Sequence, residues 1–415
     1  MKLALINIQQ LVTVSSGGQR VKAGPEQMRD LGIIENAAVI VEKERITWIG
    51  RMEELSMSAL GETDVLDCID NVVMPGFIDS HTHLLFAGSR EDEFARRCAG
   101  ETYREIAQNG GGILSTVDAV RKATKKELKK LARGWLTAML RHGTTTVEIK
   151  SGYGLDTNNE VKMLEAINEL SAEEVITIVA TFLGGHSVPP EFKDRDSAYV
   201  HEIMNRMIPY VGSKKLATFC DVFCERGFFE IAESRAILAQ GKHFGMTPKI
   251  HAEELTALGG AELAAEVGAV SADHLEHVTG PGIEALARAG TVATLLPGVS
   301  FFLNHRYAPA RKLVDAGVPV ALASDFNPGS CMSYTMPLMM TIACTQMQMT
   351  TEEAISASTL NAAAALNLSA ELGSIEVGKK ADLIVLAIPN YQYLTYHFGE
   401  NHVEKVVKNG VILEF

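Results

Sequence analysis

Several features are scarce or missing in this sequence of 415 residues. No apolar stretch approaches the ~18 residues that a transmembrane helix needs. The six cysteines are scattered and form no Cys-x-x-Cys pair. This usage argues against a disulfide scaffold and favours a reducing cytoplasm. There is also no internal repeat and no low-complexity segment, so a solenoid architecture is not expected.

Positive charge is also in short supply. The chain has 38 Lys and Arg against 51 Asp and Glu, a formal net charge of −13. Such a chain is a poor partner for a nucleic-acid backbone or an anionic membrane, and we expect neither. An anionic substrate would therefore have to meet a local cation. Hydrophobic residues at 47% and charged residues at 21% are ordinary for a globular protein.

Both ends of the chain are rich in predicted strands. The apolar start is interrupted by Asn7, Gln9 and Gln10, which favours a strand over a signal peptide. The tail has the same character and turns at Asn409-Gly410, a pair typical of tight hairpins. We therefore expect residues 1–70 and 378–415 to fold together into one small composite β-sandwich domain.

The middle of the chain alternates predicted strands with helical patterns, which indicates an α/β fold with a (β/α)8, TIM-like barrel over residues 71–377. The expected strands cover residues 72–78, 144–149, 175–183, 219–224, 248–251, 271–278, 291–296 and 319–323. Helical patterns cover residues 128–142, 158–170, 232–244, 260–267 and 282–289. Such barrels carry their chemistry on loops at the carboxyl ends of the strands.

The strongest chemical signal is a His-x-His pair, His81 and His83, directly after the first expected barrel strand and its Pro-Gly. Side chains two residues apart on a strand point to the same face, here the barrel mouth. Neutral imidazoles suit zinc or iron. A bare pair of this kind is often accidental, but its position after an apolar strand favours a metal site.

Two more candidate ligands end later strands: His251 the fifth and Asp325 the eighth. Alone, His251 is more often structural and Asp325 more often a turn or cap residue. With the His-x-His pair, however, the three imidazoles and one carboxylate would converge in one mouth. That set can hold one divalent metal, with a position left for water. The metal would lower the pKa of the water toward ~7.

Candidate proton-transfer groups lie close by in the sequence. His274 ends the sixth strand region and could be a fifth ligand, a structural residue or, as we favour, a proton-transfer group. Glu254 lies three residues beyond His251, within reach of the bound water or the leaving nitrogen. Spacing alone does not rank Glu254 above its neighbour Glu253.

A second metal is not expected. Barrels of this type usually bridge two metals with a carboxylated lysine on strand four, and residues 219–225 contain no lysine. Cys220 and Cys224 could be soft ligands but are interpreted as buried thiols. Lys150 closes strand two and is interpreted as a structural or substrate-side cation.

This set of histidines and aspartate resembles the amidohydrolase superfamily, and the resemblance extends over nearly the whole chain. Finer motifs resemble one branch of it, the enzymes that open the imidazolone ring in histidine degradation. These motifs lie at residues 81–90, 103–113, 148–154, 183–186 and 325–330. The resemblance implies hydrolysis of a cyclic amide bearing a carboxylate, 4-imidazolone-5-propanoate, to N-formimidoyl-L-glutamate. It also implies one Zn2+ or Fe2+/Fe3+ per chain and a homodimer.

The resemblance further implies roles for individual residues. His81, His83, His251 and Asp325 would bind the metal, while Glu254, His274, Asp325 and His186 would act in catalysis. The substrate contacts would be Arg90, Tyr103, Tyr153, His186, Glu254, Asn327, Gly329 and Ser330. Arg90 offers a planar fork for a carboxylate or ring carbonyl. His186 would donate to the carbonyl oxygen as negative charge develops there.

Two alternatives remain open from the sequence. A purine or pyrimidine deaminase of the same superfamily would share the barrel and the ligands. A non-catalytic scaffold relative would be expected to lose ligands, whereas every expected position is filled here.

Overall fold

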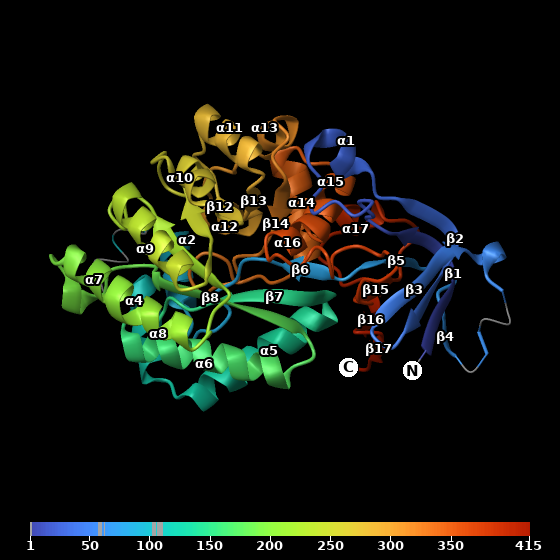
Figure 1. Cartoon of the computed structure of the whole chain (residues 1–415), viewed down its shortest axis with the longest axis horizontal. Helices are drawn as coiled ribbons and strands as arrows, with labels where there is room; N and C mark the ends of the chain where they lie inside the picture. Colours follow the sequence, from blue (N-terminus) through green and yellow to red (C-terminus); the bar gives the residue numbers. More distant parts are fainter. Residues whose placement is uncertain (1, 57–59, 62, 102–104, 106–110) are drawn as a thin grey trace.

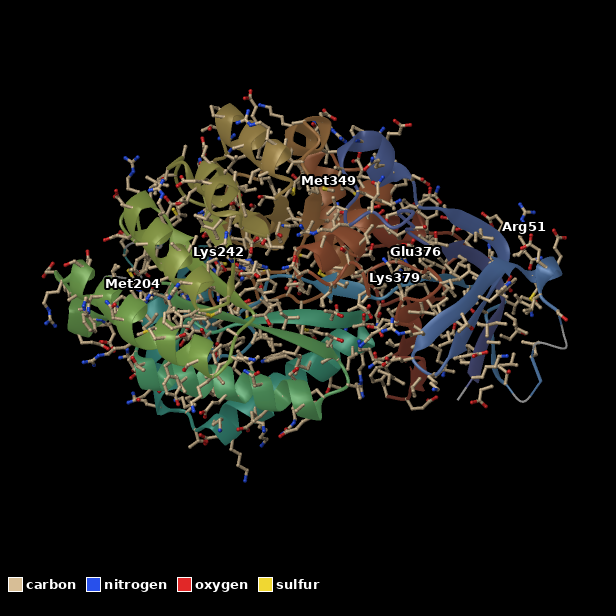
Figure 2. All side chains as sticks on the ribbon, in the orientation of Figure 1. Arg51, Met204, Lys242, Met349, Glu376 and Lys379 are labelled. Carbon is tan, nitrogen blue, oxygen red and sulfur yellow. The ribbon has the colours of Figure 1, made fainter. Side chains whose placement is uncertain are left out.

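The computed structural model describes residues 2–56, 60, 61, 63–101, 105 and 111–415. It contains two sheets that lie end to end, a parallel barrel and a smaller sheet that carries both chain termini (Figure 1). Arg51 on the small sheet and Met204 on the outer helices of the barrel lie at opposite ends of the molecule (Figure 2). Glu376 and Lys379, an ion pair at 3.3 Å, lie between them.

The small sheet confirms that the two chain ends fold together. Its strand order is β17-β16-β15-β5-β1-β2-β3, with β4 paired to β1. The bounds are β1 Lys2–Val12, β2 Ile33–Glu42, β3 Arg45–Arg51, β4 Asp64–Asp67, β5 Val72–Pro75, β15 Leu383–Leu386, β16 Val403–Lys408 and β17 Val411–Leu413. As predicted, Asn409 and Gly410 turn the chain between β16 and β17, both with positive φ.

The predicted eight-stranded parallel barrel is also confirmed. Its strand order is β14-β13-β12-β11-β9-β8-β7-β6, with β10 beside β9. The bounds are β6 Phe77–Asp79, β7 Thr144–Lys150, β8 Thr177–Gly185, β9 Phe219–Cys224, β10 Thr247–Pro248, β11 Ile250–Ala252, β12 Ser271–His274, β13 Val292–Leu295 and β14 Val320–Leu322. The first and last strands meet just beyond their ends, where Asp325 N donates to His81 O and His83 N donates to Phe326 O, each at 3.0 Å.

The structure differs from the prediction at the first barrel strand. The single strand expected over residues 72–78 is two strands, separated at Gly76. β5 pairs with β1 and β15 in the small sheet, and only β6 enters the barrel. The apolar run is continuous because both strands are buried, so hydrophobicity gives no sign of the change of sheet.

Helices pack around the barrel and confirm the alternating pattern. The long ones begin where the sequence provides caps: Thr124 before α5 and Asp156 before α6 each accept from the amide three residues on. The helices are α1 Gly24–Arg29, α2 Glu91–Cys98, α4 Ile113–Lys122, α5 Lys125–Arg141, α6 Thr157–Glu173, α7 Asp196–Glu202, α8 Ile208–Ser213, α9 Ile231–His243, α10 Gly260–Val267, α11 Gly280–Ala289, α12 Pro297–Leu303, α13 Ala310–Asp315, α14 Met336–Met347, α15 Thr351–Ala357, α16 Leu360–Ala364 and α17 Tyr393–Tyr396.

Short helical turns complete the chain at η1 Met52–Glu54, η3 Pro190–Phe192 and η4 Ile203–Met207. No helix in the described part of the chain has both the length and the apolar character needed to span a membrane.

Candidate metal centre and substrate pocket

The predicted ligands come together at one end of the barrel. His81 and His83 follow β6, His251 lies in β11, and Asp325 follows β14. All four side chains are buried. Because parallel strands present their carboxyl ends on the same rim, residues far apart in the sequence meet at the barrel mouth.

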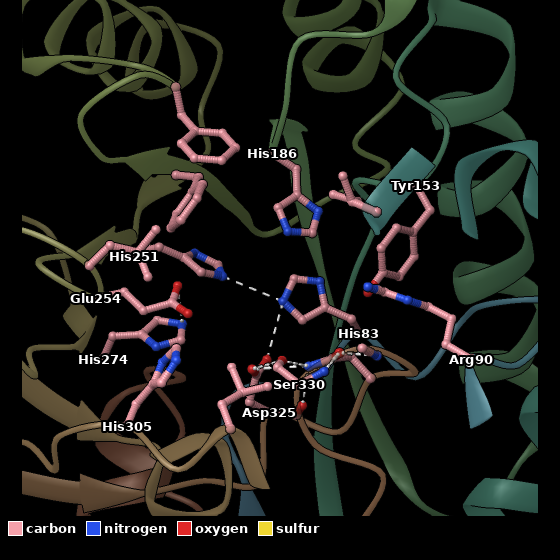
Figure 3. A pocket seen from close by; sticks show the side chains of 17 residues that line it. His83, Arg90, Tyr153, His186, His251, Glu254, His274, His305, Asp325 and Ser330 are labelled. Atoms are coloured by element: carbon pink, nitrogen blue, oxygen red, sulfur yellow. Dashed lines mark hydrogen bonds and ion pairs between the residues drawn. The ribbon is translucent and has the colours of Figure 1, made fainter. Parts of the chain in front are cut away.

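The facing atoms of this group lie within a short distance of one another. Asp325 Oδ1 lies 3.4 Å from both His81 Nε2 and His83 Nε2. His83 Nε2 in turn lies 3.4 Å from His251 Nε2 (Figure 3). Asp325 Oδ1 and His81 Nε2 are buried and have no hydrogen-bond partner among the described residues. Buried polar atoms of this kind are costly unless a partner satisfies them, and a divalent cation would satisfy all four.

The protonation of these groups agrees with that fit. Burial lowers the pKa of His81 and of His83 well below the usual value, so both rings are neutral and offer lone pairs. Burial also raises the pKa of Asp325 to about 7. A bound cation would reverse that rise, because it favours the carboxylate form.

A layer of buried charged residues supports the histidines from inside the barrel. Asp273 Oδ2 lies 2.6 Å from His81 Nδ1, and Asp221 Oδ2 lies 3.0 Å from His251 Nδ1. Lys150 Nζ lies 2.8 Å from Asp221 and 3.8 Å from Asp273. A carboxylate that accepts from Nδ1 leaves Nε2 unprotonated toward the metal position. The layer also includes Lys249 and Glu148, which lie 3.2 Å apart.

Sequence reasoning assigned no role to Asp221 or Asp273 and only a loose one to Lys150. The available signal was charged residues inside otherwise apolar strands, which are rarely buried unless they are paired. The structure places Lys150 inside the barrel, between two acids, with no exposed surface. Its position is that of a structural cation rather than a substrate-side one.

His274 and Glu254 face each other beside the ligand group. His274 Nε2 lies 3.6 Å from Glu254 Oε2, and His274 Nδ1 lies 3.7 Å from Glu276 Oε2. Although burial opposes it, the charge of Glu254 and of Glu276 raises the pKa of His274 to about 10. Burial raises the pKa of Glu254. The pair therefore combines a protonated imidazole with a carboxyl group in the pocket wall.

Glu253, the neighbour that spacing did not separate from Glu254, has a different environment. Its side chain is buried, and its Oε1 accepts from Gly259 N at 3.1 Å. It does not line the pocket, whereas Glu254 does.

A pocket opens above the ligand group and brings most of the predicted substrate contacts together. Arg90 and Tyr153 lie on one side, and Glu254, His274 and His305 lie on the other (Figure 3). The pocket is lined by His83, Arg90, Ile113, Tyr153, His186, Phe223, Phe228, His251, Glu254, Leu255, His274, Leu303, His305, Asp325, Asn327, Gly329 and Ser330. The predicted contact Tyr103 lies outside the described residues.

The arginine is held by an acid of the next helix. Arg90 Nε and Nη2 donate to Glu93 Oε2 at 2.9 and 2.8 Å. Glu93 Oε1 accepts from Gly112 N at 2.9 Å, which connects Arg90 to the start of α4. Arg90 packs tightly on the turn after β14: a Cβ added at Gly329 would lie 2.2 Å from Arg90 Nη1.

Asn327 organises that turn through its side chain. Its Oδ1 accepts from Gly329 N and Ser330 N at 2.8 Å each, and its Nδ2 donates to Asp325 Oδ2 at 3.0 Å. The backbone donors that the sequence suggested for a substrate carboxylate therefore already have a partner. Asn327 fixes the orientation of Asp325 as well as the shape of the pocket floor.

His186 lies against His83 and has a defined hydrogen bond. The two rings are stacked with centroids 4.8 Å apart, and His186 Nδ1 lies 3.0 Å from Gly152 O. Because a carbonyl oxygen only accepts, Nδ1 carries the proton. Burial lowers the pKa of His186 to about 3, so the ring is neutral and its Nε2 is an acceptor. This state suits acceptance of a substrate N–H better than the predicted donation to a carbonyl oxygen.

Two pocket features were missed at the sequence level. His305, which follows α12, reaches the pocket beside His274 (Figure 3). Phe223 and Phe228 pack edge to face, with ring centroids 4.6 Å apart, and form an apolar wall. Neither had a motif, because both depend on which strand ends and loops the fold brings together.

Comparisons with known proteins agree with this architecture. The amidohydrolase family model matches residues 72–413. An imidazolonepropionase of Geobacillus sp. (strain WCH70) is 49% identical over 99% of this chain and 97% of its own length. One of Porphyromonas gingivalis (strain W83) is 46% identical over 100% of this chain and 97% of its own length.

Solved structures at low sequence identity share the fold. Guanine deaminase of E. coli has a TM-score of 0.73 at 14% identity and covers 100% of this chain and 99% of its own. An adenosine deaminase of Xanthomonas campestris with bound zinc has a TM-score of 0.69 at 18% identity and covers 99% of this chain and 92% of its own. With near-full-length identity approaching one half to its curated relatives, the chain belongs to the amidohydrolase family and, within it, to the imidazolonepropionases.

Proposed function

We propose that this chain hydrolyses 4-imidazolone-5-propanoate to N-formimidoyl-L-glutamate. Membership of the imidazolonepropionases is the finding that carries the proposal. The pocket supports it, because Arg90 lies across from the ligand group and can hold a propionate while the ring reaches the reacting side. Arg90 also provides the local cation that an anionic substrate of a chain with net charge −13 requires.

His81, His83, His251 and Asp325 would hold one divalent metal. When bound, such an ion acts as a Lewis acid that makes hydroxide available near neutral pH. Three imidazoles and one carboxylate fit both zinc and iron, so we propose one of the two per chain. Metal analysis of the purified protein decides between them.

Proton transfer falls to the chain's own residues. Glu254 would accept the proton of the attacking water and deliver it to the ring nitrogen that leaves, as the C–O bond forms and the C–N bond breaks. His274, protonated beside Glu254, would donate toward the carbonyl oxygen as negative charge develops there. Asp325, held by Asn327, would pass a proton between the water and this pair.

Substrate orientation depends on the opposite wall. Arg90 would bind the propionate, and Tyr153 would pack against the ring. His186 would accept the N–H of the ring through Nε2, in keeping with the Nδ1 proton that it donates to Gly152. Tyr103 stays a predicted contact from the family resemblance. A homodimer in a reducing cytoplasm is likewise proposed; the six free cysteines support the compartment.

The test is the loss of imidazolone absorbance with freshly made substrate and metal-quantified protein, with guanine and cytosine as controls. We expect turnover that needs about one metal per chain and gives formimidoylglutamate by mass spectrometry, with both controls inert. Fully loaded protein that leaves imidazolone untouched would contradict the proposal.

A variant assigns the proton-transfer role. Glu254→Gln should retain the metal but lose about 10²-fold or more in kcat, because an amide cannot accept the proton of the water. Normal turnover in this variant would remove Glu254 from the mechanism.

A further inference from the structure

The loop of residues 151–155, between β7 and α6, forms the wall of the pocket opposite Glu254. It carries Tyr153 into the pocket, and Gly152 O accepts the hydrogen bond that sets the proton position on His186. The loop is conformationally demanding, because Gly152 and Leu155 have φ of 106° and 52°. Left-handed backbone of this kind persists where surrounding contacts impose it.

One buried carboxylate supplies those contacts. Glu160, in the first turn of α6, accepts from Gly152 N with both oxygens at 3.1 Å. Its Oε1 also accepts from Gly154 N at 2.8 Å and from Leu155 N at 2.9 Å. The side chain has no exposed surface. A carboxylate that accepts from three backbone amides forms charge-assisted hydrogen bonds, which are stronger than neutral ones.

The packing leaves no slack between Glu160 and the loop. A Cβ at Gly154 would lie 2.4 Å from Glu160 N, and one at Gly152 would lie 3.0 Å from His186 Nδ1. Displacement of the carboxylate would therefore shift the Gly152 backbone and, with it, the partner of His186. Glu160 does not line the pocket, so any effect on substrate must pass through the loop.

We propose that Glu160 is a positioning residue for this enzyme: through three backbone amides it holds Tyr153 and His186 in the geometry that binds the imidazolone ring. The inference rests on the proposed function, because it assigns Tyr153 and His186 to that ring. It adds a residue outside the pocket whose carboxylate determines the ring-binding wall.

The first variant is Glu160→Gln, which keeps the size of the side chain but replaces one acceptor oxygen with an NH2 group that faces amide donors. We expect KM for imidazolonepropionate to rise about tenfold or more, with a smaller loss in kcat and unchanged metal content. The Glu160→Asp variant keeps the charge but shortens the reach, and we expect an intermediate KM. It also serves as the test if Glu160→Gln does not fold.

Glu353→Gln is the matched control. Glu353 is likewise buried in the first turn of a helix, α15, and accepts from a backbone amide, Thr350 N, at 2.9 Å. It lies outside the pocket lining and its loop. We expect this variant to lower Tm without a change in KM. A Glu160→Gln enzyme that only loses Tm, as this control does, with KM unchanged would overturn the proposal.

A second measurement does not depend on the substrate. Hydrogen exchange of the peptide covering residues 151–155 should be slow in the wild type and faster in Glu160→Gln by at least about tenfold. If the wild type does not hydrolyse imidazolonepropionate but exchange still responds, the proposed function fails while the positioning of the loop stands. Unchanged exchange in Glu160→Gln would contradict the positioning itself.

Discussion

At the scale of single residues, Gly329 decides where the Arg90 guanidinium can lie. A methyl group at position 329 would overlap Arg90 Nη1, so Gly329→Ala must displace the arginine or the turn. We expect KM for the carboxylate-bearing substrate to rise about tenfold, since a bidentate site loses its alignment. Steady-state kinetics give the answer. Gly134→Ala, where an added Cβ has open space, is the control. Equal KM in both variants would separate Gly329 from substrate binding.

Asp273 provides a second prediction at this scale. Its carboxylate lies 2.6 Å from His81 Nδ1 and fixes which nitrogen faces the metal position. Asp273→Asn should weaken metal binding about 10- to 100-fold, as measured by competition with a chelator. Asp382→Asn changes another buried, lysine-paired carboxylate, in the small sheet, and should leave metal affinity alone. If the two variants bind metal equally well, Asp273 does not orient the ligand.

Residue types with few alternative uses could be predicted from the sequence. His81 and His83 stand out because two imidazoles on the same face at the end of an apolar strand are typical of a metal site. Asp221 and Asp273 do not stand out, because a carboxylate in a strand is visible as a support only when its histidine partner is known. Likewise, the orientation of His186 depends on Gly152 O, a backbone atom that carries no residue-type signal.

At the scale of elements, periodicity predicted the barrel strands and most of their helices, but not the change of sheet at Gly76. β5 and β6 are consecutive in sequence, and both are buried, yet they pair with different sheets. The cue is the glycine. Gly76 passes so close to β7 that a Cβ would lie 2.4 Å from the side chain of Thr145. A close approach of this kind is a tertiary fact that hydrophobic patterning does not report.

That junction gives a prediction for folding. Gly76→Ala forces the crossover strand away from β7 and should destabilise the protein by about 1–3 kcal/mol. Thr145→Ala removes the atoms that the new methyl group would meet. The double variant should therefore regain part of the lost stability, as measured by urea denaturation. Additive losses in the double variant would show that contact with Thr145 is not the cause.

At the scale of the whole molecule, the metal position lies across the seam of the barrel. His81 and His83 follow the first strand and Asp325 follows the last, and two backbone hydrogen bonds of 3.0 Å connect the two sides there. An ion held by ligands from both sides would join segments that lie at opposite ends of the barrel sequence. The metal would then stabilise the closure of the barrel as well as serve the reaction.

Removal of the metal should consequently lower Tm and loosen the seam first. An ion that binds only the folded chain stabilises it by about 4 kcal/mol at a thousandfold excess over Kd. We expect chelation to lower Tm by several degrees and to speed hydrogen exchange around residues 81–83 and 325–326 before the other barrel strands, with both effects reversed by added zinc or iron. His81→Ala should show the low Tm with or without metal. Uniform exchange over the whole barrel after chelation would mean that the ion adds stability without closing the seam.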